Sequence, residues 1–193
     1  GAGVKRAVVN VHYLAEMMEA HLAAHSHGLE IAISDERALL LETGGGLIKA
    51  KPLIDADPFY CVNSDNLWTD GDTNALVRLA ERWDDEAMDF LLLLIPFDQA
   101  NNHTGKGDFH LSSEGRLIRR SPEEERGEFV FTGIQLISQR ALTDAPEGPF
   151  STNLFWSRAI ESGRCFGLVH DGLWFDVGWP GAIPATEDIL ARA

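Results

Sequence analysis

Hydrophobic residues in the first half of the chain switch repeatedly between strand-like and helix-like spacing. The runs at 59–64 and 88–95 are apolar without alternation, which is typical of parallel strands covered on both faces. The predicted elements, strand and helix in turn, lie at 4–11, 14–22, 29–33, 47–54, 59–64, 76–83 and 88–95. This order predicts an α/β fold with a doubly wound, mainly parallel mixed sheet of Rossmann-like type.

The second half of the chain is richer in strand patterns. Residues 108–118 alternate around a Ser-Glu-Gly turn and predict a hairpin, and 129–137 predicts one long strand. The remaining predicted elements are a helix at 151–162, short strands at 164–170 and 173–176, and a closing helix at 185–193. We therefore expect residues 1–193 to form a single domain with a β-rich subregion.

Composition narrows the classes of partner. The chain has 193 residues, and its 30 acidic and 16 basic residues give a net charge of −14, which disfavours binding to nucleic acid. Phosphate-bearing ligands remain compatible if a divalent cation offsets the local charge, which favours Mg²⁺. No apolar run is long enough to span a membrane, so no membrane partner is expected and the cytoplasm is the expected location.

Two carboxylates end apolar runs that lie far apart in the sequence. Asp65 follows the run that begins at Pro58, and Asp176 ends the run that begins at Leu173. Ligands of open α/β sheets gather at the carboxyl ends of strands, so Asp65 and Asp176 are candidates for binding one shared cation. The alternative is that each aspartate only caps the turn or helix that follows it.

Two glycine-containing segments are candidate ligand loops. Gly44, Gly45 and Gly46 precede a predicted helix, where glycine lets the backbone approach a ligand and leaves N–H groups facing outward. The segment 103–109 combines two glycines with Lys106 and an acid, a suitable place for contact with a sugar or phosphate. A tight turn and a flexible loop are the respective alternatives.

Taken together and in order, these segments resemble the sugar-1-phosphate nucleotidylyltransferases, in particular those that act on N-acetylmuramate 1-phosphate with UTP. The resemblance covers essentially the whole chain. The segments are Leu41-Glu42-Thr43-Gly44-Gly45-Gly46, Val62-Asn63-Ser64-Asp65 with Trp68-Thr69-Asp70, Gly105-Lys106-Gly107-Asp108-Phe109, Phe131-Thr132-Gly133-Ile134 and Trp174-Phe175-Asp176-Val177-Gly178.

The resemblance implies a reaction in which a sugar-1-phosphate oxygen attacks the α-phosphate of a nucleoside triphosphate and releases pyrophosphate. Charge neutralisation and in-line positioning are the main requirements of such a transfer. By resemblance, the site residues are Asp65 and Asp176 on Mg²⁺, Thr43, Gly44 and Gly45 on the nucleotide, and Gly107, Asp108, Thr132 and Gly133 around the sugar.

Several alternatives stay open within and beyond this family. The alternative substrate pairs are GTP with mannose 1-phosphate and dTTP with glucose 1-phosphate. The alternative outside the enzymes is a non-catalytic protein that binds nucleotide sugars. The family's first strand, its Gly-rich triphosphate loop and the following helix have no counterpart before Val4, so we expect the chain to be a fragment. The sequence allows either a monomer or a homodimer.

Overall fold

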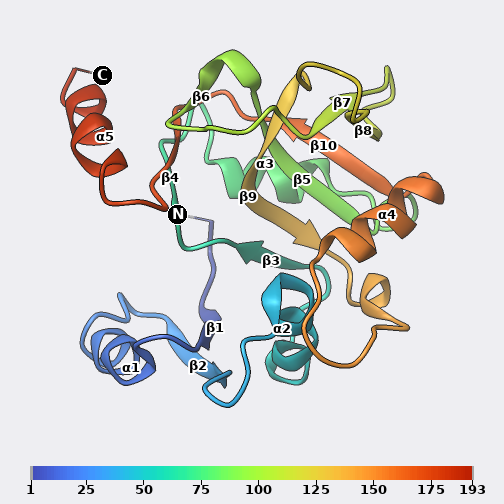
Figure 1. The fold of residues 1–193 in the computed structure, drawn as a ribbon. Helices are drawn as coiled ribbons and strands as arrows, with labels where there is room; N and C mark the ends of the chain where they lie inside the picture. Colours follow the sequence, from blue (N-terminus) through green and yellow to red (C-terminus); the bar gives the residue numbers. More distant parts are fainter. Residues whose placement is uncertain (1, 193) are drawn as a thin grey trace. The chain divides into compact units, whose positions relative to one another are not determined.

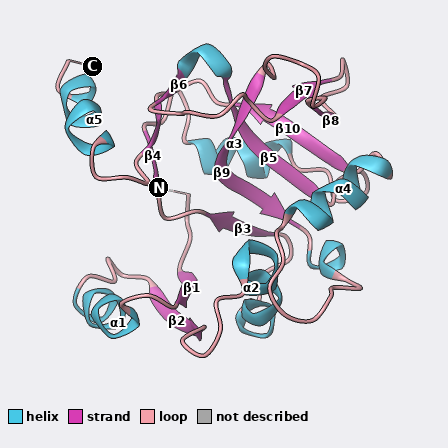
Figure 2. Ribbon diagram, viewed as in Figure 1, coloured by secondary structure: helices cyan, strands magenta, loops and turns pink. Residues whose placement is uncertain are grey.

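The computed structural model describes residues 2–192. These residues form two compact units. Unit 1 comprises the chain up to Phe59 together with Ser138–Ala159, and unit 2 comprises Tyr60–Ile137 together with the chain from Ile160 onward. Figure 1 traces the helices and strands along the chain, and Figure 2 shows that both units combine the two kinds of element.

Unit 1 contains the predicted succession of strand, helix and strand at its start. Strands β1 and β2 pair in parallel over six residues, from Arg6 opposite Glu30 to Val11 opposite Asp35. The elements are β1 (Arg6–Val11), α1 (Ala15–Ala24), β2 (Glu30–Asp35), α2 (Glu42–Ala50), the 3₁₀ turns Lys51–Leu53 and Gln139–Leu142, and α4 (Asn153–Glu161), whose last two residues fall in unit 2.

Helix α2 differs from its prediction. It begins at Glu42 rather than near Leu47, so that Gly44, Gly45 and Gly46 lie inside the helix and are buried. A Cβ atom on Gly44 would lie 2.5 Å from the Phe150 ring, which packs directly on the helix backbone. Glycine is poor in helices by propensity alone. Here close tertiary packing selects it, and that packing cannot be seen in local sequence.

Unit 2 is built on a mixed sheet with the strand order β10-β5-β9-β7-β8, in which β3 also pairs with β9. A second, three-stranded sheet has the order β4-β11-β6. The elements are β3 (Phe59–Val62), whose first residue falls in unit 1, β4 (Asn66–Trp68), α3 (Ala75–Arg82), β5 (Phe90–Pro96), the 3₁₀ turn Phe97–Gln99, β6 (Ala100–Asn101), β7 (Phe109–Leu111), β8 (Leu117–Arg119), β9 (Phe129–Ile137), β10 (Cys165–Val169), β11 (Trp174–Asp176) and α5 (Ala182–Leu190).

The α/β class and the mixed sheet are confirmed. Strands β10 and β5 are parallel, whereas β9 runs antiparallel to both β5 and β7, and β7 and β8 form the predicted hairpin. Antiparallel pairing therefore takes a larger share of this sheet than the sequence pattern suggested, because β9 lies between β5 and the hairpin. The short strands β4 and β6 were not predicted.

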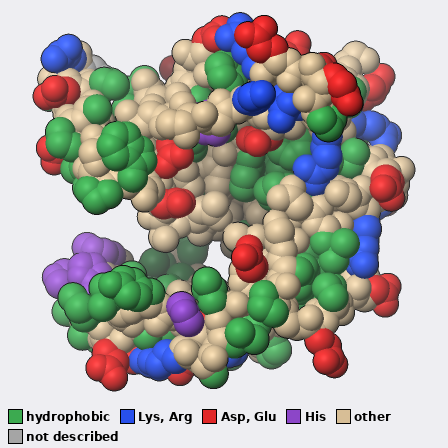
Figure 3. Space-filling model, viewed as in Figure 1, with side chains coloured by type: hydrophobic (Ala, Val, Ile, Leu, Met, Phe, Trp, Pro, Cys, Tyr) green, Lys and Arg blue, Asp and Glu red, His purple; other side chains and the backbone are tan. Residues whose placement is uncertain are grey.

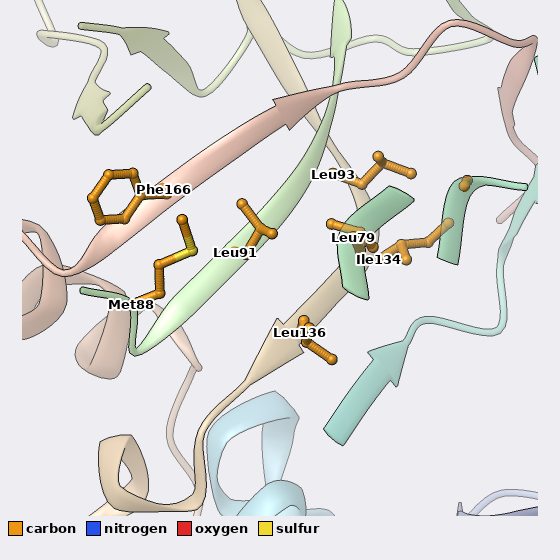
Figure 4. Close-up of a cluster of buried hydrophobic side chains, with 8 residues drawn as sticks. Leu79, Met88, Leu91, Leu93, Ile134, Leu136 and Phe166 are labelled. Carbon is orange, nitrogen blue, oxygen red and sulfur yellow. The ribbon is translucent and has the colours of Figure 1, made fainter. Parts of the chain in front are cut away.

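The core of unit 2 forms around β5, whose residues Phe90 to Ile95 are all fully buried. Leu91 and Leu93 of β5 belong to a cluster of buried side chains contributed by several elements (Figure 4). Its members are Ala75, Leu79, Met88, Leu91, Leu93, Ile134, Leu136 and Phe166. Each large apolar side chain buried in this way stabilises the fold by about 1.5–3 kcal/mol, so β5 is firmly held in unit 2.

Both cysteines are free, and burial raises the pKa of the Cys61 thiol to about 11. A thiol with so high a pKa is protonated at neutral pH and is a poor nucleophile.

In the part of the chain that the structure describes, no helix combines the length and the apolar character needed to cross a membrane.

Histidines and exposed apolar side chains gather on unit 1 around α1 (Figure 3). The rings of His21 and His25 stack with their centroids 4.5 Å apart, and Tyr13 and Met17 are among the exposed apolar residues. Among residues 2–192, however, no three or more His, Cys, Asp or Glu side chains are grouped so that they could hold a metal ion.

Candidate functional site

The structure brings Asp65 and Asp176 together in unit 2. Asp65 lies in the turn between β3 and β4, and Asp176 is the last residue of β11. Strands β4 and β11 pair antiparallel, with Asn66 opposite Asp176, and the Val177 N–H donates to the Asp65 carbonyl at 2.9 Å. We call Asp65 and Asp176 the carboxylate pair, and the paired strands β4 and β11 the β4–β11 ladder.

The side chains of the carboxylate pair converge beside Gly178. A Cβ atom placed on Gly178 would lie 3.3 Å from Asp176 Oδ1 and 3.3 Å from Asp65 Oδ2. The two oxygens can therefore be no further apart than the sum of these distances. Asp65 is exposed and Asp176 is half-buried, so both can be reached by a ligand from solvent.

The capping alternative accounts for only part of this arrangement. Asp176 Oδ1 accepts a hydrogen bond from the Gly178 N–H at 3.0 Å, which shapes the turn after β11. The N-cap of helix α3, by contrast, is Asn74, which accepts from the Val77 N–H. Asp65 therefore does not cap that helix, and its side chain lies beside Gly178 together with that of Asp176.

Two converging carboxylates offer hard oxygen ligands, the kind that Mg²⁺ prefers. Magnesium commonly takes one or two protein carboxylates and completes its shell with water and substrate phosphates. Asp65 and Asp176 fit that pattern, and both belong to unit 2. They are the residues of this chain that would hold such an ion.

Asn66 and Gly133 complete the surroundings of Asp65. The Asn66 Nδ2 donates to Asp65 Oδ1 at 3.2 Å, and the Asn63 N–H donates to the Gly133 carbonyl at 2.8 Å. Gly133 has φ +83°, and a Cβ atom there would overlap Asn66 Nδ2. Gly133 was predicted to lie in a sugar pocket, whereas Asn66 was not singled out, although it belongs to the polar cluster that ends the apolar run.

Thr132, which the resemblance assigns to the sugar pocket, has its side chain turned into unit 2. It is fully buried, and its hydroxyl donates to the Leu93 carbonyl at 2.8 Å. Its own carbonyl accepts from Trp174 Nε1 at 2.8 Å. Thr132 therefore fixes β11 against β9, and its effect on the carboxylate pair is indirect.

Gly107 and Asp108 lie where the hairpin meets β9. Gly107 is buried with φ +77°, and a Cβ atom on it would lie 2.9 Å from the Gly127 carbonyl. The exposed Asp108 accepts from the Phe131 N–H through Oδ2 at 2.9 Å. Asp108 is thus held beside the part of β9 that leads to Gly133, while Gly107 permits a close backbone contact.

Thr43, Gly44 and Gly45 belong to unit 1, and their polar groups have partners there. The N–H groups of Gly44 and Gly45 donate to the Phe150 carbonyl at 2.8 and 3.1 Å. Thr43 Oγ1 accepts from the Thr152 N–H at 3.0 Å. The expectation that the glycine N–H groups face outward is wrong, because both are used in packing the 150–152 segment on α2.

This packing predicts the outcome of a Gly44→Ala substitution. The new methyl group would lie 2.5 Å from the Phe150 ring and 2.8 Å from the Phe150 carbonyl oxygen. We expect a loss of about 1–3 kcal/mol in the free energy of unfolding, larger than the gain of about 1 kcal/mol in helix propensity. Urea denaturation followed by circular dichroism measures the change, and a net gain in stability would contradict the packing described here.

Comparison with known proteins identifies relatives over most of the chain. It is 40% identical over 195 residues to the N-acetylmuramate α-1-phosphate uridylyltransferase of Caulobacter vibrioides, covering 100% of this chain and 80% of the relative. It is 31% identical over 180 residues to the enzyme of the same name from Neisseria meningitidis, covering 92% of this chain and 74% of the relative. No protein-family model matches the chain.

Among solved structures, the chain is similar to HddC from Yersinia pseudotuberculosis complexed with GMP-PN. The TM-score is 0.76 at 18% sequence identity, covering 97% of this chain and 80% of that chain. At this level of identity the likeness concerns the fold. The fold therefore agrees with the relationship that the two sequence relatives indicate.

Proposed function

Because the chain belongs to the sugar-1-phosphate nucleotidylyltransferase family, we propose that it transfers the uridylyl group of UTP to N-acetylmuramate 1-phosphate. Enzymes of this family make a nucleoside diphosphate sugar and pyrophosphate from a nucleoside triphosphate and a sugar 1-phosphate. The proposed products are UDP-N-acetylmuramate and pyrophosphate. The observation that carries this choice of substrates is the 40% identity, over the whole of this chain, to a uridylyltransferase that acts on N-acetylmuramate 1-phosphate.

The proposed reaction forms one bond and breaks one at the α-phosphorus of UTP. An oxygen of the sugar phosphate attacks the α-phosphorus, and the bond to the β-phosphate oxygen breaks as pyrophosphate leaves. Negative charge concentrates on phosphate oxygens throughout, so catalysis depends on positioning and charge neutralisation rather than on a protein nucleophile. A bound Mg²⁺ would neutralise part of that charge and orient the phosphates.

The side chains around the carboxylate pair support this chemistry. We propose that Asp65 and Asp176 hold the cation, with Gly178 leaving room between their oxygens. Asn66 donates to Asp65 Oδ1, which fixes one oxygen, while Asp65 Oδ2 lies beside Gly178, as does Asp176 Oδ1. The backbone at Gly107 and Gly133, with the Asp108 carboxylate, is proposed to border the sugar.

A matrix of substrates tests the proposal. The protein is incubated with Mg²⁺, one of UTP, GTP or dTTP, and one of the 1-phosphates of N-acetylmuramate, N-acetylglucosamine, mannose or glucose. Pyrophosphate release and the nucleotide sugar are both quantified. We expect UTP with N-acetylmuramate 1-phosphate to give a kcat/KM at least about tenfold above every other pair, a difference of about 1.4 kcal/mol in transition-state binding.

The other outcomes of the matrix are also decisive. Faster turnover of GTP with mannose 1-phosphate, or of dTTP with glucose 1-phosphate, would reassign the substrates within the family. Binding of a nucleotide sugar in calorimetry, without pyrophosphate release above an Asp65→Ala baseline from any pair, would favour a binding protein over an enzyme.

A further inference from the structure

His170 is a buried titratable residue that the proposed reaction does not use. It follows β10, it is 2% exposed, and its backbone N–H donates to the Leu94 carbonyl at 2.7 Å. Burying a histidine removes its polar ring from water, which is unfavourable unless the ring makes compensating hydrogen bonds. The bonds that the ring makes therefore indicate its role.

Both ring contacts of His170 are with backbone carbonyls. Nε2 lies 3.1 Å from the Thr69 oxygen and 3.3 Å from the Leu173 oxygen. Since both are acceptors, Nε2 carries the proton, and Nδ1 is buried without a hydrogen-bond partner in the described structure. A second proton on Nδ1 would therefore have no acceptor.

The surroundings of His170 favour the neutral ring, mainly because the ring is buried. Desolvation is the main effect and lowers the pKa of His170 below its ordinary value of 6.5. The two carbonyl contacts and the Asp171 carboxylate oppose that change, whereas Arg78 assists it. Asp171 and Arg78 are themselves paired at 2.6 Å, so their opposite charges largely cancel at the ring.

Thr69 and Leu173 close one end of the β4–β11 ladder. The Thr69 N–H donates to the Leu173 carbonyl at 3.0 Å, and the Leu173 N–H donates to Thr69 Oγ1 at 3.1 Å. The ladder is only three residue pairs long, and its other end is the carboxylate pair. His170 thus binds both strands where they close, three residue pairs from the two aspartates.

We propose that His170 is a positioning residue that acts through the β4–β11 ladder to hold Asp65 and Asp176 at the separation that binds a divalent cation. The inference rests on the proposed role of the carboxylate pair. The positioning role of His170 requires a neutral ring whose one N–H is shared between two carbonyls. Because the ladder is short, loss of that bridge lets the two strands separate and changes the distance between the carboxylates.

The test compares His170→Phe, which removes the donor, with His170→Gln, whose amide supplies an N–H at a similar position. Mn²⁺ binding without substrates is measured by electron paramagnetic resonance, and hydrogen exchange of the Val177 amide, which bonds to Asp65, is measured by NMR. We expect about a tenfold weaker Mn²⁺ affinity in His170→Phe, at the lower end of effects reported for groups that orient metal ligands. The Val177 amide should exchange about tenfold faster, and His170→Gln should stay within about threefold of the wild type.

A core substitution separates positioning from general destabilisation. Leu117→Ala removes a buried side chain of the hairpin strand β8, which is not part of the ladder, so it should lower stability and leave the Mn²⁺ affinity of the folded protein unchanged. Equal losses of Mn²⁺ affinity in Leu117→Ala and His170→Phe would overturn the proposal. Both measurements are independent of turnover, so a failed uridylyl-transfer assay and a failed positioning role are distinguishable.

A pH titration keeps the proposal testable if His170→Phe does not fold. Protonation of the ring adds a donor without an acceptor, so Val177 exchange in the wild type, corrected for the intrinsic rate, should accelerate as pH falls from 7 to about 5. His170→Gln cannot titrate and should show no such acceleration. Identical profiles in the two proteins, or a tenfold loss of Mn²⁺ affinity in His170→Gln, would overturn the proposal.

Discussion

Asp65→Ala and Asp176→Ala should each reduce pyrophosphate release by about 10³-fold or more at saturating substrate, with the fold retained. The physical reason is that each substitution removes half of the carboxylate pair, whose oxygens both lie beside Gly178. A single remaining carboxylate holds a divalent cation weakly, and the charge that develops on the phosphates is then poorly neutralised. The measurement is kcat as a function of Mg²⁺ concentration for the two variants and the wild type.

Isosteric variants and a nearby control sharpen this prediction. Asp65→Asn and Asp176→Asn keep the side-chain shape but remove the charge, so they should lose nearly as much activity as the alanine variants. Asp72→Ala removes the same charge from an exposed position outside the pair and should retain activity within about twofold, as expected for a surface position. If Asp72→Ala were as damaging as Asp65→Ala, the loss would reflect net surface charge rather than a cation site.

Local pattern predicted the elements that are periodic and buried. The continuous apolar runs of β3 and β5 and the alternation of β7 and β8 define strands without reference to the rest of the chain. The same runs placed Asp65 and Asp176 at strand ends. That the two side chains meet follows from the antiparallel pairing of β4 with β11, a contact between segments over a hundred residues apart, and β4 is too short to give a pattern of its own.

Residues whose role depends on such long-range contacts were misread or missed. Gly44 was predicted to precede a helix and to let the backbone approach a ligand, but in the structure it gives the Phe150 segment close access to a helix. Thr132 was assigned to the sugar pocket by the family resemblance, and the structure shows its hydroxyl bonded to the neighbouring strand β5. The importance of Asn66 depends on the approach of Gly133 from β9, and local sequence contains no signal for that approach.

Replacing Gly133 with alanine should lower kcat/KM by about 10²-fold while leaving a folded protein, the effect expected when a reacting group moves by about 1 Å. A methyl group at Gly133 would overlap Asn66 Nδ2, so the Asn66 side chain must move away from Asp65 Oδ1. Asp65 then loses its orienting donor and rotates relative to Asp176. The backbone at φ +83° adds a cost of about 1–2 kcal/mol in the free energy of unfolding.

A second glycine of unit 2 separates backbone strain from displacement of Asn66. Gly115 has φ +82°, nearly the same as Gly133, but a Cβ atom there would meet its nearest atoms at 3.8 Å. Gly115→Ala should therefore lose similar stability in urea denaturation and keep wild-type kcat/KM. Equal activity losses in the two variants would mean that strain alone disables the site. Selective loss in Gly133→Ala, with a higher Mg²⁺ concentration needed for half-maximal activity, would instead trace the defect to the contact between Asn66 and Asp65.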